Sequence, residues 1–224
     1  RNLIEIFSQN VQIAFENVQL QCEIENTQQE LVWRLSEALE QRSNETGNHV
    51  RRVSHICFEL AKAYGLSQLD TELVRDASPL HDVGKVGIPD AILHKPGKLD
   101  EQEWVVMKSH AQRGYNILSG SKRPLVEAGA IIAQEHHEWW DGSGYPYGLS
   151  GNDIPLEGRI VALADVFDAL TSTRPYKPAW SVEQAVNFLI KESGQHFDPD
   201  LTAVFLGLIP EIVAIMQTFS DHDE

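Results

Sequence analysis

The first 41 residues contain neither proline nor glycine, and their apolar side chains recur at three- and four-residue intervals. This spacing predicts one long helix with an apolar stripe, like the seam of a coiled coil. The stripe runs through Ile4, Phe7, Val11, Ala14 and Val18, and then shifts, as in a stutter, to Ile24, Leu31, Leu35 and Leu39. The helix could pack on its own domain. We favour a homodimer formed through this helix, because a single exposed stripe needs a partner.

The remainder of the chain has helical apolar spacing and no alternating strand pattern. We expect helices over 50–64, from Asp70 toward residue 80, from Asp100 to 118, over 125–137 and 156–172, from Ser181, and from Asp198 to about 219. Asp100 with Glu103, and Ser181 with Gln184, have the spacing of capping boxes. Pro79 predicts a kink. The predicted fold is all-α, with a dimerisation helix over 1–41 and a globular domain over 42–224.

Residues 138–155 differ in composition, because glycines and prolines alternate there with Trp139, Trp140, Tyr145 and Tyr147. Glycine and proline predict a loop. Aromatic side chains in a loop are unfavourable unless they pack or bind something. The loop is therefore a self-packed surface loop, a wall of a substrate pocket or a docking surface for a partner protein.

The composition argues against several classes of function. Of 224 residues, 42% are hydrophobic, and the net charge of -15 argues against binding a nucleic-acid polymer or an acidic membrane. No apolar run approaches 18 residues, so we expect no membrane span. Two cysteines without a paired framework favour the cytoplasm. Because the chain begins with Arg1, we expect a sensory or receiver domain upstream of it.

Candidate metal ligands are spread along the chain. They include five of the nine histidines, namely His49, His81, His110, His136 and His137, with Glu45, Asp82 and Asp165. Adjacent residues on a helix point about 100° apart, so the pair His81 and Asp82 can reach two ions. A lone histidine is more often structural. The combination predicts a site for several ions that activates water.

Several motifs in this order resemble those of the HD-GYP phosphodiesterases, a branch of the HD metal-dependent phosphohydrolases. The segments are His81-Asp82-Val83-Gly84-Lys85, His136-His137-Glu138, Asp141-Gly142-Ser143-Gly144-Tyr145-Pro146, Ala164-Asp165-Val166-Phe167-Asp168 and Arg174-Pro175-Tyr176-Lys177. The match extends from about residue 31 to about residue 205. It implies an all-helical HD bundle that hydrolyses a cyclic dinucleotide to its linear form. Cyclic di-GMP is the default substrate, and 3',3'-cyclic GMP-AMP is the alternative.

The resemblance also implies roles for individual residues. All eight candidate ligands, Glu45 included, are expected to bind divalent ions. Asp82 would bridge two ions as a catalytic residue, and the catalytic Lys85 would offset negative charge that develops on the phosphate. The implied substrate-binding residues are Lys85, Arg174, Lys177, Asp168 and Tyr145. Asp168 could instead orient a ligand imidazole or pair with Arg174.

Two ions are expected, and Glu45 could support a third. Iron or manganese is favoured because the ligand set has no cysteine thiolate, a ligand that zinc often uses; zinc, nickel and cobalt stay as alternatives. Two other functions also remain open. The chain could bind a cyclic dinucleotide as a receptor without cleaving it, or act as an HD phosphohydrolase on another nucleotide.

Overall fold

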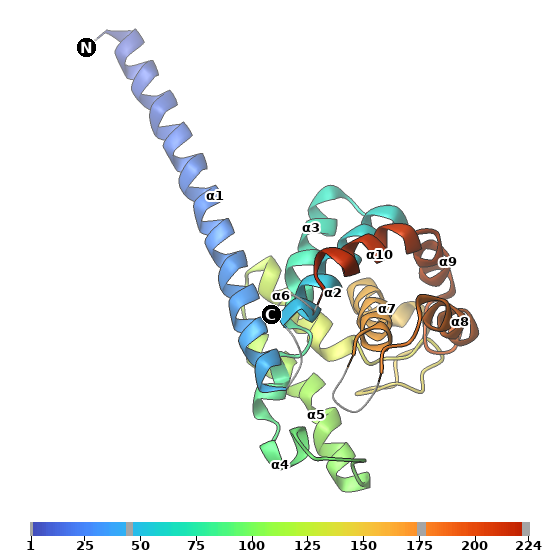
Figure 1. Ribbon diagram of the computed structural model, residues 1–224. Helices are drawn as coiled ribbons and strands as arrows, with labels where there is room; N and C mark the ends of the chain where they lie inside the picture. Colours follow the sequence, from blue (N-terminus) through green and yellow to red (C-terminus); the bar gives the residue numbers. More distant parts are fainter. Residues whose placement is uncertain (1, 44–46, 174–177, 221–224) are drawn as a thin grey trace.

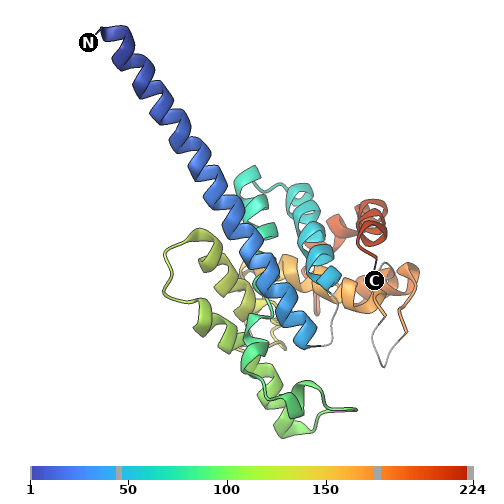
Figure 2. The ribbon, with the colours of Figure 1, turned by 60° about the vertical axis from the view of Figure 1, so that its left-hand side comes forward.

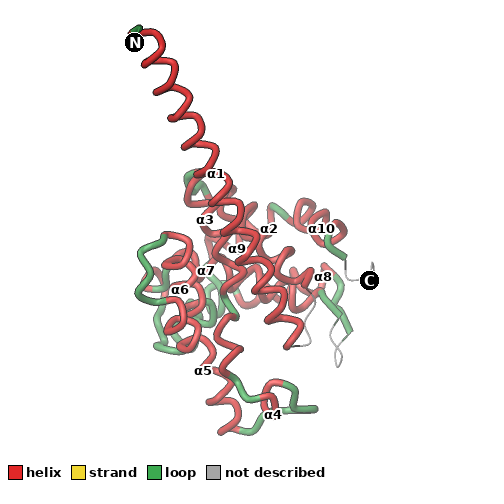
Figure 3. Tube along the Cα trace, turned by 90° about the vertical axis from the view of Figure 1, so that its left-hand side faces the viewer, coloured by secondary structure: helices red, strands yellow, loops and turns green. Residues whose placement is uncertain are grey.

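The computed structural model of this protein describes residues 2–43, 47–173 and 178–220. Within these ranges the chain forms helices joined by loops, with no strand longer than the isolated bridge between Ser193 and Phe197 (Figure 3). The predicted all-α fold class is therefore confirmed.

Helix α1 (Leu3–Arg42) projects from the other helices, and its amino end lies far from them (Figures 1 and 2). Its apolar side chains from Leu3 to Ile24 are exposed. The last third of the helix packs on the domain, where the Trp33 ring meets His55 edge-on at 6.1 Å and Glu40 is buried. One end of α1 thus packs on its own domain, while the other end leaves an apolar stripe uncovered.

Two helices lead to the His81-Asp82 pair, α2 (Gly47–Tyr64) and α3 (Gln68–Ala77). Helix α3 begins two residues before the predicted Asp70, because Ser67 caps it: the Ser67 hydroxyl accepts from the Asp70 backbone N–H at 3.2 Å. Pro79 ends the α-helix instead of kinking it, since it lies in the short 3-10 helix η1 (Ser78–Leu80). The chain then continues into the 3-10 helix η2 (Val83–Gly87), so His81 and Asp82 lie between two tight turns.

The middle of the chain contains α4 (Asp90–Leu93), α5 (Glu101–Leu118), α6 (Pro124–Glu135) and α7 (Leu156–Thr171). Both predicted capping boxes are confirmed, one at the start of α5 and one at the start of α8 (Val182–Glu192). The loop predicted over residues 138–155 is also confirmed, because those residues hold only the short helix η3 (Gly151–Asp153). The helix predicted over 125–137 ends two residues earlier than expected: α6 ends at Glu135, so His136 caps it and His137 lies just beyond it, which extends the loop to residues 136–155.

The predicted single helix from Asp198 to residue 219 is wrong. The chain instead forms α9 (Pro199–Gly207) and α10 (Ile209–Thr218), with a 69° bend between them. Pro210 lacks the backbone N–H that an uninterrupted helix would need there. No single helix in the described ranges is long and apolar enough to cross a membrane; only α9 and α10 taken together would meet that test, and they are bent.

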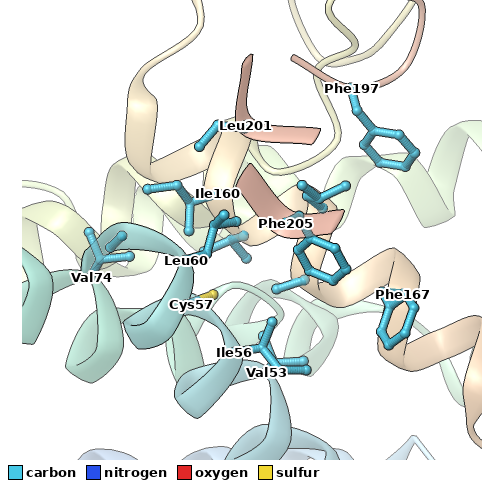
Figure 4. Close-up of a cluster of buried hydrophobic side chains, with 14 of the residues drawn as sticks. Val53, Ile56, Cys57, Leu60, Val74, Ile160, Phe167, Phe197, Leu201 and Phe205 are labelled. Atoms are coloured by element: carbon cyan, nitrogen blue, oxygen red, sulfur yellow. The ribbon is translucent and has the colours of Figure 1, made fainter. Parts of the chain in front are cut away.

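The hydrophobic core lies between α2, α7 and α9 (Figure 4). Ile56 and Leu60 of α2 and Ile160 of α7 belong to one cluster of buried side chains, and the rings of Phe167 and Phe205 pack edge-on at 5.1 Å. Each of these side chains is fully buried, which stabilises the fold by roughly 1.5–3 kcal/mol per residue. The core fixes α2 and α7 relative to each other, and these two helices carry His49 and Asp165.

Candidate metal centre and substrate pocket

Five histidines from separate segments meet in one place. His49 begins α2, His81 follows η1, His110 lies on α5, and His136 and His137 follow α6. Their rings form a continuous series, with centroid distances of 5.8 Å from His49 to His81, 5.3 Å from His81 to His136, and 5.5 Å from His136 to His110. The structure therefore brings together all the predicted histidine ligands.

Asp82 lies in the middle of this series. Its Oδ2 atom is 3.3 Å from Nε2 of His81, whereas its Oδ1 atom is 3.3 Å from Nε2 of His110 and 4.0 Å from Nε2 of His136. Burial would raise the pKa of Asp82, but Lys85, His81 and His110 hold that pKa well below its usual value. Asp82 is thus ionised, with one oxygen toward each half of the cluster.

The two halves differ in charge. On one side, Nε2 of His49 lies 3.5 Å from Oδ1 of Asp165 and 3.6 Å from Oε1 of Glu40. Nitrogen and oxygen donors of Glu40, His49 and His81 lie within 4.8 Å of one another. On the other side, donors of His110, His136 and His137 lie within the same distance. Each half therefore offers donors that suit one divalent ion.

Hydrogen bonds fix the orientation of four of the rings. The Nδ1 atom faces a backbone carbonyl in His81 (Ser78, 2.8 Å), His110 (Met107, 2.8 Å) and His136 (Ile132, 3.0 Å). In His49 it faces Oδ2 of Asp168 at 2.7 Å. The Nδ1 proton is held by these acceptors, so Nε2 is the ring atom that faces the centre and is available to bind an ion. All four Nε2 atoms are buried and lack a hydrogen-bond partner in the described ranges, which fits a metal site.

The pKa values of the histidines also differ between the two halves of the cluster. Burial, with help from neighbouring imidazoles, lowers the pKa of His136 to about 3 and that of His137 well below its usual value. Around His49, burial acts in the same direction, but Glu40 and Asp168 outweigh it and raise the pKa of His49 to about 10. The second half thus holds neutral imidazoles, the form that binds metal ions.

Asp168 is fully buried behind His49. Besides His49, its carboxylate accepts hydrogen bonds from the Arg52 guanidinium at 2.5 and 3.1 Å. The sequence offered three roles for Asp168, and the structure places it where it can orient the His49 imidazole rather than on the wall of the cavity. The pairing arginine among the described residues is Arg52, three residues after His49 on α2.

Gly84 explains why the motif can pack against α5. A Cβ atom at this position would lie 1.9 Å from the carbonyl oxygen of His110 and 2.5 Å from the backbone nitrogen of Gly114. Real Cβ atoms do not approach backbone this closely, so a side chain would force η2 away from α5. The glycine thus allows Asp82 to reach His110.

A cavity of about 430 Å³ opens beside the cluster. Polar groups of Asp82, Lys85, His110, His137 and Asp165 contribute to its lining. The rest of its lining is largely apolar and includes Leu93, Trp104, Met107, Tyr145, Val166, Ala169 and Leu170. This combination of an apolar wall with a few converging charged groups is typical of a small-molecule site.

The loop over residues 136–155 supplies Tyr145 to this cavity. The Tyr145 ring stacks on His137 with centroids 4.7 Å apart, and Nζ of Lys108 lies 5.1 Å from the Tyr145 ring centre. The loop is held from inside by Glu138, whose carboxylate accepts from the backbone N–H groups of residues 147–149. It is held from outside by His196, which stacks on Trp139 at 4.1 Å and accepts from the Trp140 N–H. Of the three functions considered for the loop, this geometry favours a pocket wall.

Three of the predicted site residues, Glu45, Arg174 and Lys177, lie outside the described residues. Sequence reasoning missed Glu40, Arg52 and Trp104. Glu40 is a polar residue on a helix that reads as solvent-exposed, so no local signal distinguished it. Trp104 follows a capping box on α5, and only the position of α5 against the cluster places it at the cavity.

The comparisons with known proteins agree with this geometry. A family described as an HD domain matches residues 34–201, which contain His49, His81, Asp82 and Asp165. The chain belongs to the HD domain family. Within it, the predicted resemblance to the HD-GYP branch is confirmed.

Two curated relatives of this HD domain are half identical to it. The 3'3'-cGAMP-specific phosphodiesterase 2 of Vibrio cholerae is 50% identical over 221 residues, which cover 99% of this chain and 42% of the relative. The cyclic di-GMP phosphodiesterase response regulator RpfG of Xanthomonas campestris is 50% identical over 177 residues, which cover 79% of this chain and 47% of the relative. This HD domain chain spans about half the length of the curated relatives it matches.

A solved structure shares the fold of this HD domain. The cyclic GMP-AMP specific phosphodiesterase V-cGAP3 of V. cholerae superposes with a TM-score of 0.65 at 23% identity, over 87% of this chain and 51% of that one. At this identity the likeness shows the fold, which is the predicted HD helical bundle.

Proposed function

We propose that this HD domain is a phosphodiesterase that hydrolyses a cyclic dinucleotide, either cyclic di-GMP or 3',3'-cyclic GMP-AMP, to the linear dinucleotide. The observation that carries the proposal is the position of Asp82, which turns one carboxylate oxygen toward each half of the histidine cluster at the edge of the cavity. The names of the two half-identical relatives support both substrates.

The cluster fits at least two divalent ions. One would be held by His49, His81 and Asp165, the other by His110, His136 and His137, and Asp82 would serve both. When bound, such ions act as Lewis acids toward a phosphate and lower the pKa of bound water to about 7. Iron or manganese suits this ligand set better than zinc, because zinc often binds cysteine thiolates and the set contains none. Cys57 is buried in the core, and Cys22 is exposed on α1.

The remaining groups of the site position and neutralise the substrate. Nζ of Lys85 lies 2.6 Å from Oδ2 of Asp82 on the cavity wall, where its charge can offset negative charge that develops on a phosphoryl group. Arg174 and Lys177, implied by the family motif, would contact the phosphates. Trp104 and Met107 offer an apolar face against which a purine ring can stack.

We further propose that α1 forms a homodimer with a second copy of this chain. Its exposed apolar residues between positions 3 and 24 recur at coiled-coil spacing, and burial of such a stripe drives association. The division into a dimerisation helix over 1–41 and a catalytic domain over 42–224 is part of this proposal.

Turnover and metal content test the catalytic proposal together. Protein loaded anaerobically with Fe(II) or Mn(II) is incubated with cyclic di-GMP, 3',3'-cyclic GMP-AMP and a panel of nucleoside mono- and triphosphates, and the products are separated by chromatography. We expect linear dinucleotides. Binding of a cyclic dinucleotide without cleavage would establish a receptor instead. Turnover of another nucleotide alone would establish a different phosphohydrolase.

A further inference from the structure

Glu40 is a buried acidic side chain at the end of α1, outside every motif that identified the site. It is only 4% exposed, and its Oε1 atom lies 3.6 Å from Nε2 of His49. We propose that Glu40 is a metal ligand, so that α1 donates a carboxylate to the ion held by His49 and His81. This inference rests on the proposed metal centre and adds to it a ligand from the projecting helix.

The crowding around His49 carries the argument. Carboxylate oxygens of Glu40 and Asp165 both lie within 3.6 Å of the same Nε2 atom, while Nδ1 already faces Asp168. A ring nitrogen presents one hydrogen at most, so Nε2 can donate to only one of these two carboxylates at a time. A divalent cation between these donors can satisfy both, and buried charges are retained where they are paired or coordinate a metal.

The donor geometry is suitable. Atoms of Glu40, His49 and His81 all lie within 4.8 Å of one another, which is close enough for the three to surround one ion that lies roughly 2.0–2.4 Å from each. Three separate segments of the chain supply them. Glu40 comes from α1, His49 from α2, and His81 from the turn after η1.

Arg42 holds the end of α1 in place. Its guanidinium donates to the backbone carbonyls of Lys85, Val86 and Ile88 at 3.0, 2.9 and 2.8 Å, and it pairs with Asp90 at 2.7 Å. Two residues from Glu40, the helix is therefore tied to the turn that carries Lys85. A shift of α1 along its axis would move the Glu40 carboxylate and the Lys85 turn together.

The consequence is a direct physical link between α1 and the ions. The exposed part of this helix is the proposed dimer surface, and its last turn reaches the centre.

Metal binding of Glu40→Gln tests the inference without using activity. The amide keeps the size of the side chain but is a much weaker ligand than a carboxylate. Glu37→Gln is the matched control, because Glu37 lies one turn earlier on α1 and pairs with Arg51 and Arg34. Mn(II) stoichiometry is measured by mass spectrometry after gel filtration, affinity by calorimetry, and folding of the metal-free proteins by circular dichroism.

We expect Glu40→Gln to lose one ion or to bind it at least tenfold more weakly, while Glu37→Gln matches the wild type. Equal stoichiometry with affinity within twofold of the wild type would overturn the inference. If Glu40→Gln does not fold, a crystal of the wild type with Mn(II) decides. An anomalous peak within about 2.5 Å of a Glu40 oxygen supports the ligand, and a peak farther away than that refutes it.

This outcome is separable from that of the proposed function. A protein that binds Mn(II) through Glu40 but cleaves no cyclic dinucleotide would contradict the phosphodiesterase and leave the ligand assignment intact. A phosphodiesterase whose Glu40→Gln variant keeps every ion would contradict the ligand assignment and leave the proposed function intact.

Discussion

Nζ of Lys85 lies 2.6 Å from Oδ2 of Asp82, so the last residue of the motif neutralises the carboxylate on which both halves of the cluster converge. The two residues lie one turn apart in and before η2, which explains their spacing in the sequence. Mutation of each residue tests a different effect. Asp82 is expected to assemble the metal centre, and Lys85 is expected to neutralise the substrate.

Replacement of Asp82 by Asn should remove the shared ligand. We expect metal content to fall and turnover of a cyclic dinucleotide to drop by roughly 10³-fold or more, because both halves lose a charged donor. Circular dichroism should show an intact fold. Asp153→Asn, on the exposed helix η3, is the control. Wild-type turnover by Asp82→Asn would exclude the bridging role.

Lys85→Ala should act mainly on the chemical step. We expect kcat to fall about 10²-fold with metal content unchanged, since Lys85 opposes charge but is not a ligand. Lys62→Ala removes an exposed lysine on α2 and should have no effect. Kinetics measured beside metal analysis distinguish the two roles. A Lys85→Ala protein that had lost its ions would show that the lysine maintains the centre instead.

Trp104 should contribute to recognition of the bases. Trp104 is 47% exposed at the cavity, and stacking on an aromatic ring is worth about 1–3 kcal/mol per base. We therefore expect Trp104→Ala to raise KM for the cyclic dinucleotide roughly tenfold. Hydrolysis of bis(p-nitrophenyl) phosphate, which has no base, should be unchanged. Val105→Ala, at a neighbouring position that is 69% exposed, is the control variant. Equal losses of activity by Trp104→Ala on the cyclic dinucleotide and on bis(p-nitrophenyl) phosphate would argue against stacking.

His196 should make the loop over residues 136–155 sensitive to acid. Burial lowers the pKa of His196 to about 4, against about 6.5 in the unfolded chain. The unfolded state therefore binds the proton first. The contribution of neutral His196 to stability is complete above pH 6.5 and is lost as the pH falls toward 4, by up to about 3 kcal/mol.

His196→Phe tests this prediction because phenylalanine can still stack on Trp139 but cannot bind a proton. Urea unfolding of both metal-free proteins at pH 8 and pH 5 gives the free energy of unfolding. We expect the wild type to lose more stability than His196→Phe between these values. An equal loss in the two proteins would show that His196 does not titrate in this range.

The dimer prediction rests on the exposed stripe of α1. Val11→Glu combined with Val18→Glu places two charges a heptad apart on the stripe and should shift the protein toward monomer in analytical ultracentrifugation. Gln12→Glu with Gln19→Glu adds the same charges at the adjacent positions and should leave association unchanged. A wild type that sediments as a monomer at all concentrations would end this proposal.

Local chemistry made much of the fold predictable. The capping boxes at Asp100 and Ser181 depend on residues three apart, and the glycines and prolines of the loop over residues 136–155 act within a few residues. The apolar pattern continues across the break at residue 208 and therefore predicts one helix, whereas the missing N–H of Pro210 favours the observed start of a second helix.

By itself, the sequence determined the helical class, the motif residues and their chemistry, because spacing along a helix and donor type are local properties. Only the tertiary structure decided that Asp168 pairs with Arg52 and His49, and that Glu40 at the end of a projecting helix is buried beside the ligands. These contacts join residues far apart in the chain, and which side chains meet depends on how α1, α2 and α7 pack. No pattern within any one of those helices contains that information.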